Sequence, residues 1–234
     1  MVGKLIKRQM IAENTVELTF QLDKEADFLA GQDMLFTIPD MPYTDSKGNN
    51  RSFSIASSPS DKTHITIATR VSDSTFKQAL MKMEMGDELF VSDIYGEMVL
   101  PEKTDQHLVF IAGGIGITPF MSMLRYIKER GLEYNITMLY SNKTEKSTAY
   151  LEELQDYHRE LENFRLLLIM TNDDNWIGES RRIGQEFIRE KIEDYENVKF
   201  FFVGPPAMVS GIQASLDNLK IKKENMVGVE FSGY

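Results

Sequence analysis

The stretch LVFIAGGIGITPFMSML, residues 108–124, joins an apolar run to a glycine-rich turn and then to a helix-like pattern. Residues 108–112 are all apolar, which is typical of a strand buried on both faces of a sheet. The glycines of residues 113–116 let a ligand approach the backbone closely. Thr118 suits a helix N-cap, and Pro119 suits the first helical turn. Because amides at a helix start attract a pyrophosphate, the stretch predicts a dinucleotide site, with a ligand-free strand–helix turn as the alternative.

The sequence after residue 103 alternates between strand-like and helix-like segments. The strand-like segments are residues 107–112, 135–141, 164–171, 198–204 and 226–231, and the helix-like segments between them are residues 118–130, 149–162, 183–195 and 206–220. Such alternation with continuous apolar strands predicts an α/β domain with a doubly wound parallel sheet.

The sequence before residue 103 consists of short strand-like segments separated by turns. These segments are residues 3–11, 15–22, 33–38, 51–56, 64–71 and 87–94, and one helix-like segment, residues 74–83, interrupts them. This pattern predicts an antiparallel β-barrel or sandwich. The chain is therefore expected to have two domains, a β-barrel domain over residues 1–103 and an α/β domain over residues 104–234.

The composition excludes several kinds of chemistry. The 234-residue chain has a formal net charge of −10 and no cysteine. The negative charge disfavours nucleic acid as a partner, and the lack of cysteine excludes disulfides, thiolate catalysis and cysteine-ligated metal centres. The histidines, His64, His107 and His158, lack metal-ligand spacing, so no metal site is predicted. No apolar run is long enough for a membrane span or a signal peptide, so we expect a cytoplasmic protein.

Two further turns of the second domain are expected at the sheet edge that holds the glycine-rich turn. Ser141-Asn142-Lys143 follows the second strand, where a doubly wound domain contacts the far ribose of a dinucleotide. Lys143 slightly favours the 2′-phosphate of NADPH, although a solvated loop lysine and NADH stay open. Gly204 and Pro205 end another strand and start another helix at this edge, with a simple connection as the alternative.

The stretch RSFS, residues 51–54, places a cation among apolar side chains. Strand alternation puts Arg51 on the same face as Phe53 and Ile55. Burying an arginine without a partner is costly, so the sequence requires an anion beside Arg51. A small barrel followed by a dinucleotide-binding domain predicts a flavin on the barrel, with its phosphates held by Arg51 through charge-assisted hydrogen bonds.

Four more side chains are candidates for contacts with the flavin. Phe53 is expected to stack on the flat ring, and Ser54 to offer its hydroxyl to a ring nitrogen. Ser74 and Thr75 begin the helix of the barrel domain and are expected to supply amides to the same pyrophosphate.

These segments together resemble the ferredoxin–NADP reductase superfamily of FAD-dependent oxidoreductases. Arg51-Ser52-Phe53-Ser54 matches its flavin motif Arg-x-Tyr/Phe-Ser, and AGGIGITP, residues 112–119, matches its nicotinamide motif. Further segments similar to those of the family follow its order at residues 68–80, 95–101, 170–183, 201–209 and 230–234, so the resemblance covers about the whole chain.

The resemblance implies which residues contact each cofactor. FAD is expected to contact Arg51, Phe53, Ser54, Thr69, Val71, Ser74, Thr75 and Tyr234. NAD(P)H is expected to contact Gly113, Gly114, Ile115, Gly116, Thr118, Ser141, Asn142, Lys143, Thr171, Gly204, Pro205 and Met208. The expected catalytic residues are Ser54, Thr118 and Glu230, the last of which supports proton traffic unless it is an ordinary surface glutamate. Tyr234 is expected to shield the flavin, with a frayed terminus as the alternative.

Three positions depart from the family pattern. Phe53 stands where tyrosine is commoner, so stacking is kept and a hydroxyl contact is lost. Val203 replaces the usual cysteine beside the nicotinamide, which puts the efficiency of hydride transfer in doubt. Ser72-Asp73 stands where glycines are frequent, which makes Asp73 an alternative helix cap.

The expected activity is that of an FAD-dependent oxidoreductase. Hydride would pass from NAD(P)H to bound FAD, and electrons would then pass to a separate acceptor, either a ferredoxin- or flavodoxin-type protein or a small molecule. One alternative is an NAD(P)H:flavin reductase that binds flavin as a dissociable substrate. A second is a non-catalytic flavin-binding sensor or subunit, which only Val203 favours.

Overall fold

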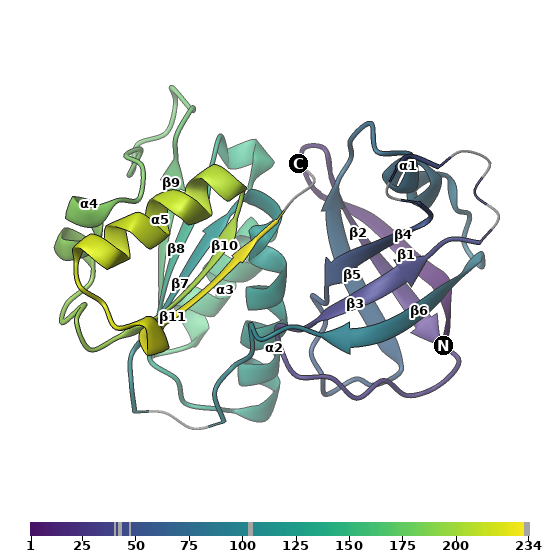
Figure 1. The fold of residues 1–234 in the computed structure, drawn as a ribbon, viewed down its shortest axis with the longest axis horizontal. Helices are drawn as coiled ribbons and strands as arrows, with labels where there is room; N and C mark the ends of the chain where they lie inside the picture. The colour runs from purple at the N-terminus through teal and green to yellow at the C-terminus, as the bar shows by residue number, and fades with distance from the viewer. Residues whose placement is uncertain (40, 42–43, 47, 103–104, 232–234) are drawn as a thin grey trace. The chain divides into compact units, whose positions relative to one another are not determined.

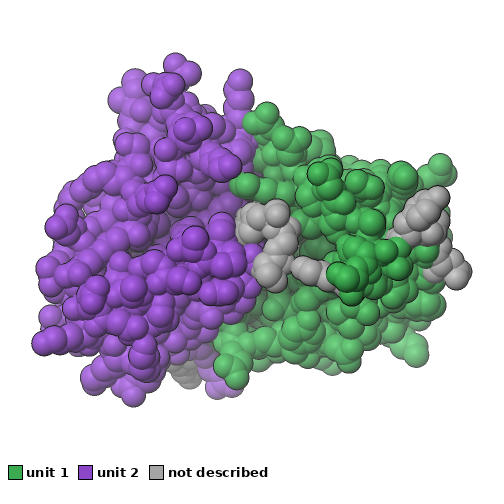
Figure 2. Space-filling view, turned by 45° about the horizontal axis from the view of Figure 1, so that its top comes forward, with its two compact units in different colours: residues 1–100, 118–129 green, residues 101–117, 130–234 purple. Residues whose placement is uncertain are grey.

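The structure is a computed structural model and describes residues 1–39, 41, 44–46, 48–102 and 105–231. Its contacts divide the chain into two units, coloured separately in Figure 2. Unit 1 comprises residues 1–100 and 118–129, and unit 2 comprises residues 101–117 and 130–234. Each unit has a hydrophobic core of its own.

Unit 1 is built on an antiparallel sheet. Its strands are β1 (Val2–Ala12), β2 (Thr15–Leu22), β3 (Asp33–Thr37), β4 (Asn50–Ser54), β5 (His64–Arg70) and β6 (Glu88–Tyr95), in the order β4-β3-β6-β1-β2-β5. Just past β4, the Ala56 amide donates to the Thr66 carbonyl of β5 at 2.7 Å. Because this bond joins the two outer strands, the sheet closes on itself, and the predicted barrel is confirmed.

Alternate residues of the strands of unit 1 point into its hydrophobic core. On β2, Val16, Leu18 and Phe20 are all fully buried and face the inside of the barrel. Helix α1 (Thr75–Lys82) adds Phe76 and Leu80 to the same core. Burying each of these large apolar side chains contributes about 1.5–3 kcal/mol to the stability of the unit.

Unit 2 contains a parallel sheet with helices on both faces, as Figure 1 shows. Its strands are β7 (Leu108–Gly113), β8 (Ile136–Asn142), β9 (Phe164–Met170), β10 (Lys199–Gly204) and β11 (Met226–Glu230), in the order β11-β10-β7-β8-β9. Helices α4 (Gln185–Lys191) and α5 (Pro206–Asn218) pack on one face through Phe187, Ile188, Val209 and Ile212, and α3 (Leu151–Glu160) lies on the other. Short 3-10 helices cover Gly114–Ile117, Glu145–Ser147 and Lys223–Asn225. The predicted doubly wound sheet is confirmed.

Most differences from the sequence-based segments lie at helix ends. The helix expected over residues 149–162 begins at Leu151, because Tyr150 has a left-handed φ of 58°. The helix expected over residues 206–220 ends at Asn218, two residues before Lys220, whose φ is 61°. Among the described residues, no helix combines the length and the apolar character that crossing a membrane requires.

Helix α2 (Thr118–Arg130) is the main difference from the predicted division of the chain. The sequence-based boundary assigns this helix to the second domain, yet its contacts group residues 118–129 with unit 1. Ser122 Oγ donates to the Ser57 carbonyl at 2.7 Å, and Arg125 Nη1 donates to the Ala56 carbonyl at 2.9 Å. The boundary itself, between residues 103 and 104, lies outside the described residues and stays a prediction.

Candidate functional site

In unit 1, the anion beside Arg51 is the carboxylate of Asp45, which sequence reasoning missed. Arg51 Nη2 lies 2.7 Å from both carboxylate oxygens of Asp45, and the Arg51 side chain is 17% exposed. Its Nη1 donates to the carbonyls of Gly48 and Asn50, and its guanidinium lies 5.5 Å from the centre of the Phe76 ring. Arg51 is thus held in a fixed orientation, and no motif in the sequence marks Asp45 as its partner.

The start of α1 reaches the same carboxylate. Thr75 Oγ1 donates to Asp45 Oδ2 at 3.2 Å. Ser74, and not the alternative Asp73, is the N-cap residue, and its side chain makes no capping hydrogen bond. Arg51 from β4 and Thr75 from α1 therefore converge on one anionic group, as a phosphate-binding pair must.

Phe53 lies in an aromatic cluster of the barrel. Its ring is 5.7 Å from the Phe36 ring in an edge-on arrangement, and 5.9 Å from the Phe76 ring at an angle of 34°. Phe53 is only partly buried. The cluster fixes the orientation of a ring that is still accessible for stacking.

Ser54 pairs with a carboxyl group that the sequence analysis did not single out. Ser54 is 5% exposed, and its Oγ donates to Asp33 Oδ1 at 2.5 Å. Burial raises the pKa of the Asp33 carboxyl above its ordinary value, and the Ser54 hydrogen bond acts in the opposite direction. The signal that finds Asp33 is the pairing of β3 with β4, in which Asp33 lies opposite Ser54.

The other candidates for flavin contact differ in exposure. Thr69 is buried in β5, where it pairs with Val16 of β2, whereas Val71 is exposed and its amide donates to the Asn14 carbonyl. Tyr234 lies outside the described residues.

In unit 2, the glycine-rich turn is packed against the turn after β10. A Cβ added to Gly113 would lie 2.3 Å from the Met208 sulfur, and one added to Gly116 would lie 2.5 Å from the Val203 carbonyl oxygen. A Cβ added to Gly204 would lie 3.3 Å from the Gly113 Cα. Protein atoms thus fill the space where a side chain of Gly113 or Gly116 would lie, and nucleotide contact at these glycines stays a prediction.

Thr118 does not cap α2. A 3-10 helix over Gly114–Ile117 runs directly into α2, so Thr118 is the first α-helical residue and is 1% exposed. Gly114 has a φ of 54°, which its lack of a side chain permits. The helical segment therefore begins in the glycine-rich turn itself, four residues earlier than predicted, and Pro119 lies in the first α-helical turn as expected.

The turn after β8 lies beside the glycine-rich turn after β7, because the two strands are parallel neighbours. Ser141 pairs with Gly113 across β7 and β8. The Thr171 amide donates to the Asn142 carbonyl at 2.9 Å, and the Asn172 amide donates to the Lys143 carbonyl at 2.8 Å. Ser141, Asn142, Lys143 and Thr171 are therefore brought together at the carboxyl edge of the sheet, where open α/β sheets bind ligands.

The side chain of Asn142 is unusual within this group. It is 4% exposed, and among the described residues neither its amide nitrogen nor its amide oxygen has a hydrogen-bond partner. A buried polar group without a partner costs about 1–3 kcal/mol. This cost is removed if a ligand or a water supplies the missing bonds.

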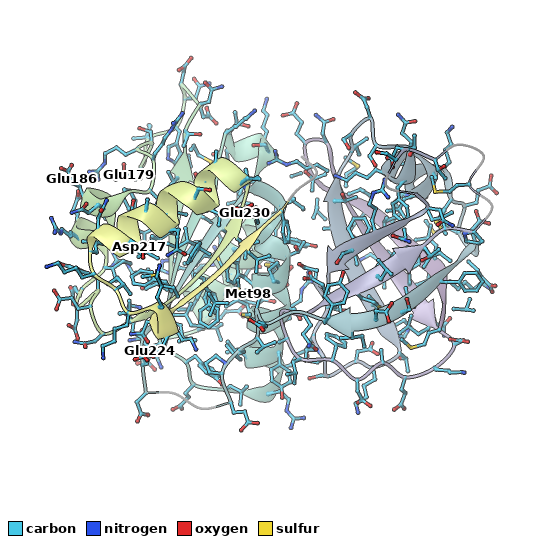
Figure 3. The ribbon with its side chains drawn as sticks, in the orientation of Figure 1. Met98, Glu179, Glu186, Asp217, Glu224 and Glu230 are labelled. Atoms are coloured by element: carbon cyan, nitrogen blue, oxygen red, sulfur yellow. The ribbon has the colours of Figure 1, made fainter. Side chains whose placement is uncertain are left out.

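Glu230 ends the neighbouring strand at the same edge. It pairs with Gly204 in the parallel register of β10 and β11, and Figure 3 shows it at the end of β11. Glu230 is exposed and lines a cavity of about 450 Å³ with Phe202 and Gly228. Among the described residues, no group of His, Asp or Glu side chains is arranged to hold a metal ion.

Comparison with protein families identifies one domain. Residues 110–214 match the oxidoreductase NAD-binding domain. This match covers the glycine-rich turn, the Ser141–Lys143 turn and the Gly204 turn. It confirms the prediction of a nicotinamide-binding domain in this part of the chain.

Among curated proteins, the chain is similar to one component of a multi-subunit reductase. It is 25% identical over 200 residues to a subunit of the Na(+)-translocating NADH-quinone reductase from Marinomonas sp. (strain MWYL1). The match covers 78% of this chain and 49% of that protein, so the chain spans about half the length of the curated relatives it matches.

Solved structures share the fold over nearly the entire chain. The flavohem-like FAD/NAD-binding domain of nitric oxide dioxygenase from Vibrio cholerae O1 biovar El Tor has a TM-score of 0.83 at 16% identity, covering 99% of this chain and 98% of that one. The flavohemoglobin from Malassezia yamatoensis with bound FAD and heme has a TM-score of 0.82 at 21% identity. This match covers 99% of this chain and 60% of that one. The chain thus shares the two-domain fold of these solved structures, and its residues 110–214 match the oxidoreductase NAD-binding domain.

Proposed function

We propose that the chain is an NAD(P)H-dependent flavoprotein oxidoreductase that passes hydride to bound FAD and then electrons to a separate acceptor. FAD, when bound, supplies the chemistry that accepts a hydride and releases electrons. The observation that carries this proposal is the convergence of Arg51 and Thr75 on one anion at the start of α1. The donor set fits a flavin phosphate, because a guanidinium and a hydroxyl at a helix start both bind phosphate oxygens.

The remaining residues of unit 1 have roles that follow from their surroundings. Phe53, fixed by the aromatic cluster, borders the flat ring. Ser54, whose hydroxyl donates to Asp33, offers its oxygen as an acceptor to a ring nitrogen. Ser74 has no capping bond to break, so its side chain is able to turn toward the phosphates.

The carboxyl edge of unit 2 is the proposed place of the nicotinamide nucleotide. The buried, unpartnered amide of Asn142 supports a ligand there, because ribose hydroxyls supply both a donor and an acceptor. The side chain of Met208 lies over Gly113 and Gly204, and moving this flexible thioether opens the glycine turn to the nucleotide.

Of the two nicotinamide nucleotides, NADH is the better supported. The sequence-based preference for NADPH rests on Lys143, which is exposed. The matched relative is by name part of an NADH-quinone reductase, which supports NADH. Because that relative is one subunit of a reductase, its name also supports another redox protein as the electron acceptor. A cytoplasmic location stays a prediction from composition.

The second candidate is an NAD(P)H:flavin reductase that releases its flavin. The Arg51–Asp45 ion pair favours it, because a bound phosphate has to compete with a carboxylate that already satisfies the guanidinium. Retention of FAD separates the two candidates, since a resident cofactor survives dialysis and a substrate does not.

The test is to load the purified protein with FAD, dialyse it exhaustively and assay NADH and NADPH oxidation with ferricyanide. The proposal predicts a yellow protein that oxidises NADH faster than NADPH without added flavin. A colourless protein that turns over only with added FAD, FMN or riboflavin supports the flavin reductase instead. A yellow protein with no turnover leaves the non-catalytic flavin-binding module.

A further inference from the structure

Asp33 and Ser54 form a paired unit on adjacent strands of the barrel. They lie opposite each other in the register of β3 and β4, and their oxygens Oδ1 and Oγ are 2.5 Å apart. This distance belongs to hydrogen bonds between a hydroxyl and an ionised carboxylate, which are shorter and stronger than neutral ones. Ser54 is buried, so its hydroxyl is coupled to Asp33 rather than to bulk water.

The second carboxylate oxygen of Asp33 lies beside Gly96. A Cβ added to Gly96 would lie 3.4 Å from Asp33 Oδ2, and Gly96 has a φ of 111°, which favours glycine. Across the sheet, Asp33 lies opposite Ser54 on β4 and opposite Tyr95, which carries a titratable phenol, on β6. Asp93, at the bulge one residue before Ile94, is exposed and carries the nearest carboxylate along β6.

The surroundings of Asp33 favour the protonated form of its carboxyl group. Burial, the larger influence, raises the pKa of the Asp33 carboxyl, and the Ser54 hydrogen bond opposes this rise. A carboxyl of this kind takes up a proton more readily than an exposed aspartate does. The proton reaches it through the hydroxyl that the proposed function places at the flavin.

We propose that Asp33 is a positioning residue that acts through Ser54, holding the proton that Ser54 exchanges with flavin N5. This inference rests on the proposed function. With a flavin bound, Ser54 Oγ would accept a proton from the reduced flavin as electrons leave to the acceptor, while its own proton moves to Asp33 Oδ1. One O–H bond forms at each step and one N–H or O–H bond breaks, so no further reactant is needed. Asp33 then returns the proton to solvent.

The first measurement uses the flavin-free protein and follows aspartate carboxyl carbons by NMR as a function of pH, with Asp33→Asn identifying the Asp33 signal. We expect Asp33 to titrate above the other aspartates. Ser54→Ala is expected to move its pKa still higher, because the bond that opposes burial is lost. An Asp33 signal that Ser54→Ala leaves unchanged overturns the coupling, whatever the protein's activity.

The second measurement uses the FAD-loaded protein and records the rate of flavin reoxidation against pH. Asp33→Asn is expected to slow reoxidation about a hundredfold and to remove the inflection that wild type shows at the Asp33 pKa. Asp33→Glu is expected to restore an inflection. The control is Asp93→Asn. Ser92 Oγ donates to Asp93 Oδ2 at 3.1 Å, so these residues form a second serine–aspartate pair, which is exposed. Asparagine also tolerates the left-handed backbone of residue 93.

The outcomes separate this inference from the proposed function. If Asp33→Asn and wild type share one pH profile while both bind and reduce FAD, the proposed function stands and the role of Asp33 is wrong. If no flavin binds but the NMR coupling is present, the proposed function fails and the proton role fails with it. A lower melting temperature in Asp33→Asn with an unchanged pH profile assigns Asp33 to structure alone and also contradicts the inference.

Discussion

At the scale of single residues, Arg51 links the barrel to its proposed ligand. Its guanidinium is oriented by two backbone carbonyls and by Asp45 before any ligand arrives. Such preorganisation lowers the ordering cost of binding, while the phosphate still has to displace Asp45 from Arg51. The sequence alone establishes that Arg51 needs an anion, but it does not predict Asp45, because no strand or helix pattern places that residue beside Arg51.

Replacing Arg51 tests whether it holds phosphate. Arg51→Ala is expected to weaken FAD binding by about ten- to a hundredfold, since hydrogen bonds to charged groups contribute about 1.5–3 kcal/mol. Riboflavin, which lacks phosphate, should bind wild type and variant equally, as measured by fluorescence titration. Arg51→Lys should lose part of the FAD affinity, because lysine keeps the positive charge but lacks the planar guanidinium that binds two oxygens at once. Equal losses for FAD and riboflavin would show a damaged barrel and not a lost phosphate contact.

Replacing Asn142 tests whether its orphaned amide serves a ligand. Asn142→Leu substitutes an apolar side chain of similar size, so the folded protein should be as stable as wild type or more stable. Binding of NADH should weaken by about tenfold if ribose hydroxyls pair with this amide. Calorimetry gives the affinity and thermal melting the stability. An unchanged NADH affinity would assign Asn142 to the protein interior only.

At the scale of elements, the sequence predicts the strands and the first residues of α2 and α5, but it does not predict the 3-10 turn before α2. The pattern of β2, with Val16, Leu18 and Phe20 facing inward, is visible in the sequence, and the predicted and observed ranges of β2 coincide. The helical segment that leads into α2 begins four residues before Thr118, because nothing local to Thr118 indicates a 3-10 turn over the glycines. The pairing of Asp33 with Ser54 depends on strand register, which a single sequence does not supply.

Two glycine substitutions are expected to have opposite effects, because the space around Gly116 is filled and the space around Gly211 is open. Gly116→Ala places a Cβ 2.5 Å from a backbone oxygen and should destabilise the protein by about 1–3 kcal/mol. Gly211→Ala, inside α5 with nothing within 4 Å of the added atom, should stabilise it by about 0.5–1 kcal/mol. Denaturant unfolding measures both, and a harmless Gly116→Ala would contradict the described packing.

The residue that leads into β7 makes stability depend on pH. His107 Nε2 lies 2.9 Å from Thr137 Oγ1, and burial, assisted by the charge of Arg165, lowers the pKa of His107 below 6.5. As pH falls through 6.5, the unfolded chain gains a proton that the folded chain resists, so stability falls until the folded-state pKa is reached. His107→Gln should flatten this part of the curve of unfolding free energy against pH. An identical slope in the variant would rule out His107 as the cause.

At the scale of the whole molecule, the sequence predicts the order of the architecture, a barrel followed by a doubly wound sheet. It does not predict that α2 groups with unit 1, because Ser122 and Arg125 bind backbone carbonyls of residues far away in the sequence. Fold and domain match known oxidoreductases, while the identity of the acceptor depends on surfaces that neither a motif nor a fold specifies.

Hydride transfer to the flavin is tested by an anaerobic titration of the FAD-loaded protein with NADH, followed through the visible flavin band. We expect the band to bleach with one equivalent of NADH per flavin and to return when an electron acceptor is added. A protein that retains its flavin while neither NADH nor NADPH bleaches it would contradict hydride transfer.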